Sequence, residues 1–287
     1  MYQPRAPYGA PLKRAAALVV GCVLAATGCG GGGAASKSAP THSAAAPPAS
    51  PSATPIPTLP PKADGTTPVF AHGKRGAKLI ALTFDADMTA DEGGRAARGE
   101  RFDNPELIAT LRQLKVPATI FMTGRWADQY PDEAKSIGAD PLFEVANHSY
   151  SHHAFATPCY GLPKVSTGAV RDDVERAFDA FRRAGVRHTV PYFRFPGGCY
   201  DDAVLKALGP VQVTAVQWDV ISGDAFAGRP GPVAEEVLAK ARPGSVVVMH
   251  CTHSAAPATE AAVRTVVPRL RARGYRLVRV SDLIGGR

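Results

Sequence analysis

The sequence is poor in cysteine and aromatic residues and lacks several common ligand-binding signatures, and each shortage excludes a class of protein. Its five cysteines include no Cys-x-x-Cys pair, which argues against a metal-binding cysteine cluster. No glycine fingerprint of the dinucleotide or P-loop type follows a strand-like segment, which argues against an open nucleotide-binding sheet. No patch combines basic and aromatic residues, so we expect no binding to nucleic acid.

Long apolar runs are also missing, and the one run near the N-terminus has the pattern of a secretory signal. Basic residues precede an apolar stretch over residues 15–26, and small residues follow it up to Cys29. The stretch is too short and too rich in alanine to predict a membrane span. We therefore expect residues 1–28 to act as a signal peptide.

The end of this signal, "AATGC" with Cys29 last, resembles the lipobox of bacterial lipoproteins, although Ala26 replaces the usual leucine. The resemblance implies that Cys29 is lipidated and becomes the mature N-terminus. The protein would then be extracytoplasmic and attached by its lipid to the outer face of the cell membrane. Cys22 is a weaker candidate because the apolar run before it is too short, and an uncleaved anchor would give the same location.

Residues 29–67 consist almost entirely of glycine, alanine, serine, threonine and proline. Such a segment cannot bury enough apolar surface to offset its loss of entropy on folding, so it predicts a disordered tether. Residues 68–287 are long enough for a single domain, which we expect to be a monomer. The formal net charge of +8 is compatible with an anionic cell wall but is not specific for one.

Within residues 68–287, strand-like runs alternate with helical patterns, which indicates βα units around a parallel sheet. One helix should begin at Asn104, which can cap it, and a long amphipathic one should cover Thr167–Ala184. About seven strands favour an α/β fold of the closed or nearly closed (β/α) barrel type. The strand-like runs are Leu79–Phe84, Ala118–Met122, Phe143–Ala146, Pro191–Phe195, Val213–Asp219, Ser245–Met249 and Tyr275–Val280.

Polar residues lie at or just after the C-terminal ends of five of these runs, where parallel barrels assemble their active sites. They are Asp85 and Asp87, His148 and His152, Arg194, Asp219 and Asp224, and His250.

Five motifs, "LTFDAD", "NHSYSH", "FRFPGGCY", "WDVISGD" and "VVVMH", have the order and spacing of those in the polysaccharide deacetylase family, the NodB-homology domain. The segment "VPATIFMTGRWADQYPDEAKSI" is similar to that family too, and the resemblance covers nearly all of residues 78–283. It implies a deformed (β/α) barrel and metal-dependent removal of N- or O-acetyl groups from a sugar polymer.

Two imidazoles and one carboxylate suit a catalytic divalent ion, with zinc the expected one. His148 and His152 supply the imidazoles, whereas His153 is expected to be a bystander. The carboxylate departs from the family, which usually has adjacent aspartates, a base and then a ligand. Ala86 takes the second place here. Side chains alternate along an extended chain, so Asp87 would share a face with the preceding aspartate and could replace the missing ligand.

Two alternatives for this position stay open. Asp87 could cap the following loop and leave the metal with two histidines and water, or an acid further along, Asp91 or Glu92, could bind it instead.

The resemblance also implies a proton-transfer machinery. Asp85 would be the general base, paired with and aimed by Arg194, and His250 would be the general acid, oriented by Asp224. The pair of Asp85 and Arg194 could also be purely architectural. We interpret Asp219 as a structural partner.

Three aromatic residues are candidates for substrate binding. Trp218 or Phe226 could supply the apolar wall near the acetyl group, because the tryptophan that usually follows the family's aspartate is absent here. Tyr200 stands where a backbone N–H of the family binds the oxyanion, so its phenol could simply lie on the rim.

The cysteines of the expected domain cannot all pair with one another, because there are three. Cys159 and Cys199 both lie in loops on the expected rim of the active site, and we favour a disulfide between them. Cys251 follows a buried strand and is expected to be a free, inert thiol.

These patterns leave two functional hypotheses. The first is a deacetylase of N-acetylated cell-wall glycan, with peptidoglycan the favoured substrate because the enzyme would be tethered beneath or within the wall. The second is a catalytically silent glycan-binding module that lost metal binding through Ala86. The retained acid and base favour the enzyme, because a binding module needs neither.

Overall fold

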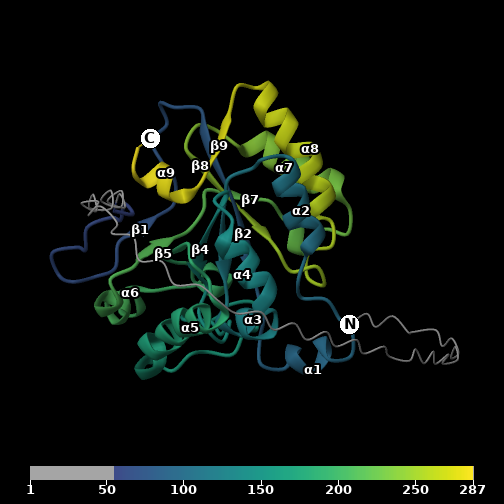
Figure 1. Ribbon diagram of the computed structural model, residues 1–287. Coiled ribbons are helices and arrows are strands. Elements are labelled where there is room, and N and C mark those ends of the chain that lie inside the picture. The colour runs from purple at the N-terminus through teal and green to yellow at the C-terminus, as the bar shows by residue number, and fades with distance from the viewer. Residues whose placement is uncertain (1–54, 287) are drawn as a thin grey trace, which may run out of the picture. The chain divides into compact units, whose positions relative to one another are not determined.

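The computed structural model describes residues 55–286, and within them one parallel sheet curls into a partly open barrel with helices on its outside (Figure 1). The strand order is β1-β6-β5-β4-β3-β2-β8-β7, with β9 also paired to β2, and every paired strand is parallel to its neighbour. The strands are β1 (Val69–Phe70), β2 (Leu79–Ala86), β3 (Ala118–Met122), β4 (Phe143–Asn147), β5 (Thr189–Phe193), β6 (Thr214–Val216), β7 (Val220–Ile221), β8 (Ser245–His250) and β9 (Arg276–Val278).

This architecture confirms the predicted α/β class and the deformed (β/α) barrel. All seven predicted strands are present, and two more, β1 and β7, bring the number among residues 55–286 to nine. These two were missed because each has only two residues, too few for a pattern to show. They are also the two ends of the strand path, so the barrel is open between them.

Helices cover the outer face of the sheet. In Figure 1, α2, α7 and α8 lie together on one side of it, and α3, α4 and α5 form a second group. The predicted cap of α2 is confirmed, since the Asn104 side chain accepts a hydrogen bond from the Leu107 N–H at 3.1 Å. The helices are α1 (Glu92–Ala96), α2 (Pro105–Gln113), α3 (Gly124–Gln129), α4 (Pro131–Ala139), α5 (Val170–Ala184), α6 (Asp202–Leu208), α7 (Pro230–Lys240), α8 (Thr259–Ala272) and α9 (Val280–Ile284). Short 3₁₀ turns are η1 (Thr167–Ala169), η2 (Pro196–Gly198), η3 (Gly209–Val211) and η4 (Asp224–Phe226).

Strand β2 shows how the core positions the site. Its side chains alternate, and Leu82, Phe84 and Ala86 belong to the large apolar cluster between sheet and helices. Ala81 belongs instead to the cluster on the inner face of the sheet. Asp85 therefore faces the barrel interior, while Ala86 packs in the core, where an alanine methyl is an ordinary residue.

The residues just before β1 contact the domain although they form no helix or strand. The Tyr192 hydroxyl donates to the Pro57 carbonyl oxygen at 2.6 Å, and the Leu59 N–H donates to the Thr214 hydroxyl at 3.0 Å. Contacts with the sheet thus begin before residue 68, where we expected the domain to start. The predicted signal, Cys29 and most of the predicted tether lie outside the described residues. Between residues 55 and 286, no helix combines the length and the apolar character needed to span a membrane.

Candidate active site

The candidate active site lies at the C-terminal ends of the strands, where the fold brings distant polar residues together. In the register of the two central strands, Asp85 at the end of β2 stands beside His250 at the end of β8. His148 directly follows β4, and Arg194 directly follows β5. The sheet itself therefore assembles four of the predicted site residues at one edge.

The loop after β4 presents two histidines to one point because its backbone is held in an unusual shape. Ser149 and His152 have positive φ angles of 69° and 56°, a conformation that costs free energy for residues other than glycine. The side-chain oxygen of Asn147 accepts a hydrogen bond from the Ser149 N–H at 2.8 Å, and the Ser149 hydroxyl accepts one from the His152 N–H at 2.9 Å. Asp173 of α5 accepts the next N–H, that of Tyr150, at 3.0 Å. These bonds fix the spacing of the two imidazoles.

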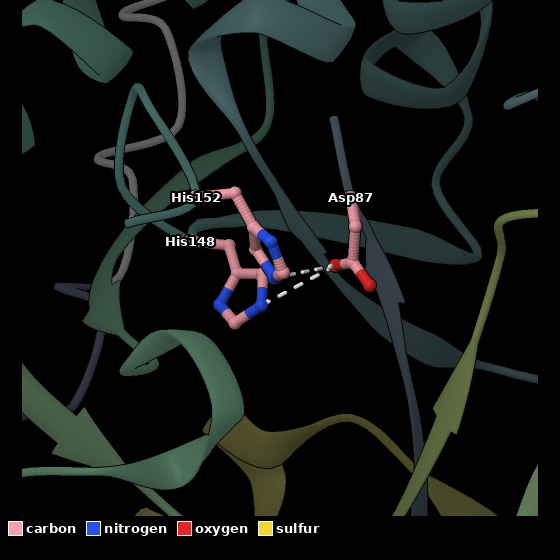
Figure 2. Close-up of side chains that lie close together, drawn as sticks. All are labelled: Asp87, His148 and His152. Carbon is pink, nitrogen blue, oxygen red and sulfur yellow. Dashed lines mark ion pairs between the residues drawn. The ribbon is translucent and has the colours of Figure 1, made fainter. Parts of the chain in front are cut away.

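The carboxylate of Asp87 points at both imidazoles, as Figure 2 shows. Its Oδ1 lies 3.3 Å from Nε2 of His148 and 3.6 Å from Nε2 of His152. The backbone N–H of Asp87 donates to the Thr252 hydroxyl at 3.0 Å, which fixes the start of this segment against the loop after β8. Sequence reasoning missed Thr252, since nothing in the pattern marks it.

These three side chains fit a divalent cation. Asp87 Oδ1 is buried and has no hydrogen-bond donor among the described residues, which is costly for a carboxylate oxygen. Ligand atoms about 2.1 Å from a tetrahedral ion are about 3.4 Å apart, and both distances from Asp87 Oδ1 to the imidazoles are close to that value. One ligand atom from each of the three residues lies within 4.8 Å of the others. Asp87, and not Ala86, therefore completes the possible ligand set.

The electrostatics of this group also favour a positive charge. Burial alone would raise the pKa of Asp87, but the neighbouring imidazoles, His152 first, lower it, so the group is a carboxylate. Burial would lower the pKa of His148, yet the charges of Asp85 and Asp87 raise it. Burial lowers the pKa of His152 to about 4, which keeps this imidazole neutral and able to donate a lone pair.

Asp85 and Arg194 form a buried ion pair. Nη1 of Arg194 donates to Oδ1 of Asp85 at 2.6 Å, its Nε donates to the Val216 carbonyl oxygen at 3.2 Å, and its guanidinium lies 3.8 Å from the centre of the Phe121 ring. The other oxygen of Asp85, Oδ2, is 3.7 Å from Nε2 of His148. One oxygen is thus held by the arginine, and the other is directed toward the centre of the site.

Arg194 has a second contact with the site through its backbone. Its carbonyl oxygen accepts a hydrogen bond from Nδ1 of His148 at 2.8 Å. A proton on Nδ1 leaves the lone pair on Nε2, the nitrogen that faces Asp87. The same residue therefore aims the predicted base and fixes the tautomer of one predicted metal ligand.

His250 has a different environment. Its Nδ1 lies 2.8 Å from Oδ1 of Asp224, and its backbone N–H donates to Oδ2 at 2.7 Å. Thr259 at the start of α8 also donates its hydroxyl to Oδ2, at 2.7 Å. Burial would lower the pKa of His250, but the hydrogen bond and the charge of Asp224 raise it to about 10. The imidazole is therefore held in its protonated form, as an acid needs.

The apolar side of the site is a cavity of about 200 Å³ that opens onto the three histidines. Trp218 and Phe226, both predicted substrate contacts, line it, whereas the Tyr200 side chain does not and instead stacks on Phe195 at 5.0 Å. No hydrogen bond links the Tyr200 N–H to another residue of the range 55–286. Further lining residues that sequence reasoning missed are Tyr160, Leu162, Ile221 and Val248.

Several polar residues near the motifs lie outside this group. Asp219 forms an ion pair with Arg75 at 2.8 Å and accepts the Val246 N–H, so it has the structural role that we expected. His153, Asp91 and Glu92 do not belong to the described cluster of possible metal ligands.

The cysteines follow the prediction. Cys159 and Cys199 form a disulfide that joins the loop after β4 to the loop after β5. Cys251 is a buried free thiol, and burial raises its pKa well above the ordinary value, which makes it unreactive.

Comparison with known proteins agrees with this geometry. The polysaccharide deacetylase family model matches residues 72–216. A chitooligosaccharide deacetylase from Sinorhizobium fredii is 32% identical over 216 residues, which cover 70% of this chain and 89% of that protein. A peptidoglycan-N-acetylglucosamine deacetylase from Bacillus cereus is 28% identical over 211 residues, covering 72% and 88%. A solved structure of a CE4 family pseudoenzyme from Bacillus anthracis is similar with a TM-score of 0.61 and 26% identity, over 75% of this chain and 68% of that one. The chain belongs to the polysaccharide deacetylase family.

Proposed function

We propose that this protein is a divalent-metal-dependent deacetylase that removes acetyl groups from N-acetylated cell-wall glycan, with zinc as the metal and peptidoglycan as the favoured polymer. The names of two relatives, a chitooligosaccharide deacetylase and a peptidoglycan-N-acetylglucosamine deacetylase, support an N-acetylated sugar as substrate. The predicted location outside the membrane, next to the wall, favours peptidoglycan.

One observation supports the proposal more than any other. The buried Oδ1 of Asp87, which has no donor among the described residues, faces the Nε2 atoms of His148 and His152 at 3.3 and 3.6 Å. His250, which is paired with Asp224, faces the other oxygen of the same carboxylate, and its Nε2 is 3.9 Å from Oδ2 of Asp87. A ligand set for a cation and a protonated imidazole thus face the same small volume.

The residues can perform the hydrolysis of an acetamide as follows. A divalent ion bound by Asp87, His148 and His152 would acidify a water molecule and polarise the acetyl carbonyl group. Asp85, held by Arg194, takes a proton from that water, whose oxygen bonds to the carbonyl carbon. By the resemblance to the family, the Tyr200 N–H would donate to the oxygen of the tetrahedral intermediate.

His250 completes the reaction. It donates the proton on its Nε2 to the amide nitrogen as the C–N bond breaks, so that acetate and a free amine leave. Asp224 accepts the hydrogen bond from Nδ1 and stabilises the charged imidazolium until the proton is transferred. The apolar side chain of Trp218, which lines the cavity, would contact the acetyl methyl group, whereas Phe226 is 81% exposed at the mouth of the cavity.

A second candidate function is glycan binding without catalysis. The similarity to a structure described as a CE4 family pseudoenzyme and the alanine at position 86 favour it. The ion pair of Asp85 with Arg194 and that of His250 with Asp224 favour the enzyme, because a binding module has no use for a base and an acid.

One experiment separates the two functions. Purified protein would be analysed for bound metal, and acetate release would be measured on N-acetylglucosamine oligomers and peptidoglycan fragments, with and without added Zn²⁺. We expect about one zinc per chain and zinc-dependent acetate release. Binding of the oligomers without acetate release under any metal would establish the silent module, and the ratio of rates on the different fragments would identify the preferred sugar.

We also propose that Cys29 is lipidated and that the domain is attached to the outer face of the membrane, as the signal pattern of residues 1–29 predicts. The variant Cys29→Ser should leave the detergent phase in a phase-partition assay, while acetate release by the domain stays at the wild-type level. Unchanged partition into detergent would overturn the lipid anchor.

A further inference from the structure

Two aromatic side chains at the mouth of the active site are far more exposed than their size would suggest. Phe226 and Tyr160 are 81% and 77% exposed, the highest values among the large apolar side chains of residues 55–286. They come from different loops, yet their ring centres are only 6.3 Å apart and their planes are inclined by 35°. Both line the cavity that leads to His148, His152 and His250. The pair therefore forms one continuous apolar surface at the entrance.

The tyrosine half of this surface is held in place. Tyr160 has a φ of 48°, in the left-handed region, and follows Cys159, which is bonded to Cys199. Its ring packs on Gly197, where a Cβ atom would lie 3.1 Å from the tyrosine ring and 2.6 Å from Sγ of Cys159. Position 197 thus needs glycine for the close approach, and the disulfide joins the two segments that meet there.

The base of the tyrosine loop is also closed by backbone hydrogen bonds. The Ala154 N–H donates to the Pro163 carbonyl oxygen at 2.8 Å, and the Val165 N–H donates to the Ala154 carbonyl oxygen at 2.9 Å. The ring of Tyr160 is therefore presented at a defined position by a short, closed loop.

The phenylalanine half is tied to the predicted acid. Phe226 ends the turn η4, and its N–H donates to the Gly223 carbonyl oxygen at 3.1 Å. Asp224, two residues earlier in the same turn, is fixed by its bonds to His250 and Thr259. The ring is exposed, but the backbone that bears it is anchored to the centre of the site.

We propose that Tyr160 and Phe226 form an aromatic platform that binds a pyranose ring of the glycan next to the sugar being deacetylated. A pyranose ring presents C–H groups on its faces, and such apolar faces pack on exposed aromatic rings, which water solvates poorly. The inference rests on the proposed function, since it assigns the neighbouring part of the same substrate.

The chemistry of the cavity wall identifies the occupant as a neutral sugar. Among residues 55–286, the acidic or basic side chains that line the cavity are those of the site itself, Asp85, His148, His152 and His250. The remaining lining residues are apolar or aromatic, with tyrosine the only one that bears a hydroxyl. Beyond those four residues, the wall offers no charged partner to a charged peptide or a phosphate, whereas an uncharged ring with an apolar face fits it.

The test compares a long glycan with a small substrate that has no neighbouring sugar ring. Tyr160→Ala and Phe226→Ala would be assayed on a chitin hexamer and on a small aryl acetate ester. We expect KM for the hexamer to rise about three- to ten-fold in each variant, while kcat on the hexamer and kcat/KM on the ester stay within about two-fold of wild type. Such a split indicates lost binding of a remote ring, since damage to the catalytic centre would lower the rate on both substrates.

Two controls sharpen this comparison. Tyr160→Phe keeps an aromatic ring and removes only the hydroxyl, so it should bind the hexamer like the wild type. Ile56→Ala removes another exposed apolar side chain, 42% exposed, which lies beside residues of β4 and β5 at the opposite ends of the strands. This variant should leave kcat and KM on both substrates unchanged.

Direct binding of the hexamer, measured by calorimetry on the metal-free protein, separates failure of this inference from failure of the proposed function. If the wild type releases no acetate from any glycan, the proposed function fails, and the calorimetric Kd still tests the platform. Alanine variants that bind the hexamer with the wild-type Kd, and have the wild-type KM where acetate is released, would overturn the platform. A Kd raised about three- to ten-fold would support it whether or not acetate is released.

Discussion

The imidazoles of the site lie in two environments that differ in what each second ring nitrogen contacts. Nδ1 of His148 donates to a neutral carbonyl oxygen, that of Arg194, at 2.8 Å, so its Nε2 is left with a lone pair directed at Asp87. Nδ1 of His250 lies at the same distance, 2.8 Å, from a carboxylate, that of Asp224. A carbonyl oxygen stabilises a protonated imidazole less than a carboxylate does, because it carries no full negative charge.

This difference teaches why histidines a few ångströms apart can have opposite functions. Burial lowers the pKa of His152, the other predicted ligand, to about 4, whereas the pKa of His250 is raised to about 10 by Asp224 against the effect of its burial. The pKa of His148 is raised as well, but chiefly by the charges of Asp85 and Asp87, which belong to the metal side of the site. His152 is therefore a lone-pair donor over the whole physiological pH range, and His250 is a proton donor. Variants that change the surroundings of the predicted ligands should therefore affect metal binding. Variants that change the surroundings of His250 should affect only proton transfer.

The largest expected effect comes from the ligand side. Asp87→Ala removes the only carboxylate in the described ligand cluster, so we expect zinc affinity to fall about ten- to a hundred-fold and acetate release to be abolished. Excess zinc should restore little activity, because the acidity and position of the bound water depend on the complete ligand set. Metal analysis after dialysis and an acetate assay measure both quantities. Retention of metal and activity would mean that water or another acid completes the ligand set.

Asp85→Asn is the matched control, since it changes the aspartate two residues earlier on the same face of the chain. It removes a base and leaves the three ligands in place. We expect zinc to stay bound while acetate release is lost. Loss of zinc in this variant would instead assign Asp85 to the metal, at 3.7 Å from Nε2 of His148 in the present geometry.

The next effect in size comes from the acid. His250→Ala removes the proton donor, so we expect kcat to fall about 10²- to 10⁴-fold with zinc still bound, the usual contribution of general acid catalysis. Substrates with a good leaving group, such as an aryl acetate, need less help from an acid and should lose much less activity. A variant that also loses its zinc would place His250 among the ligands and remove the contrast between the two environments.

Most strands and the positions of most site residues could be predicted from the sequence, because the patterns that indicate them are local. Seven strands were visible as short apolar runs, and the polar residues after them followed from the rule that parallel strands end at one edge. The alternation of side chains along β2 predicted that Asp85 and Asp87 would share a face and that Ala86 would not.

Other features depend on long-range contacts that no local pattern specifies. Thr252, in the loop after β8, and Thr259, at the start of α8, are buried, and each holds an aspartate of the site through one hydrogen bond. No local pattern distinguishes these two threonines from the others in the sequence. The strands β1 and β7 consist of residues that favour strands, but two residues are too few for an alternating pattern to show in the sequence, and only the structure shows that they pair with β6 and β8. For Tyr160 a signal was present, since it adjoins the cysteine that we expected to pair across the rim.

The smallest expected effect, and the most direct test of the contrast, is a shift in pH dependence caused by Asp224→Asn. His250 must be protonated to act as an acid, and the carboxylate of Asp224 raises its pKa to about 10, so the zinc-loaded wild type should keep kcat/KM up to alkaline pH. Removing that charge lowers the pKa toward the ordinary value of about 6.5, so the alkaline limb must move to lower pH and activity at pH 8 must fall more than activity at pH 6. We expect a loss of about ten- to a hundred-fold at pH 8 with zinc retained.

The amide also leaves the His250 N–H without its present acceptor, so thermal unfolding should be followed in parallel to separate destabilisation from loss of acidity. Ser222→Ala is the control, because it removes a hydroxyl that donates to Asp224 at 3.0 Å but keeps the carboxylate, and its alkaline limb should coincide with that of the wild type. If the limb of Asp224→Asn does not move, then the carboxylate does not set the charge of His250, and the two histidine environments do not differ in the way that their second ring nitrogens indicate.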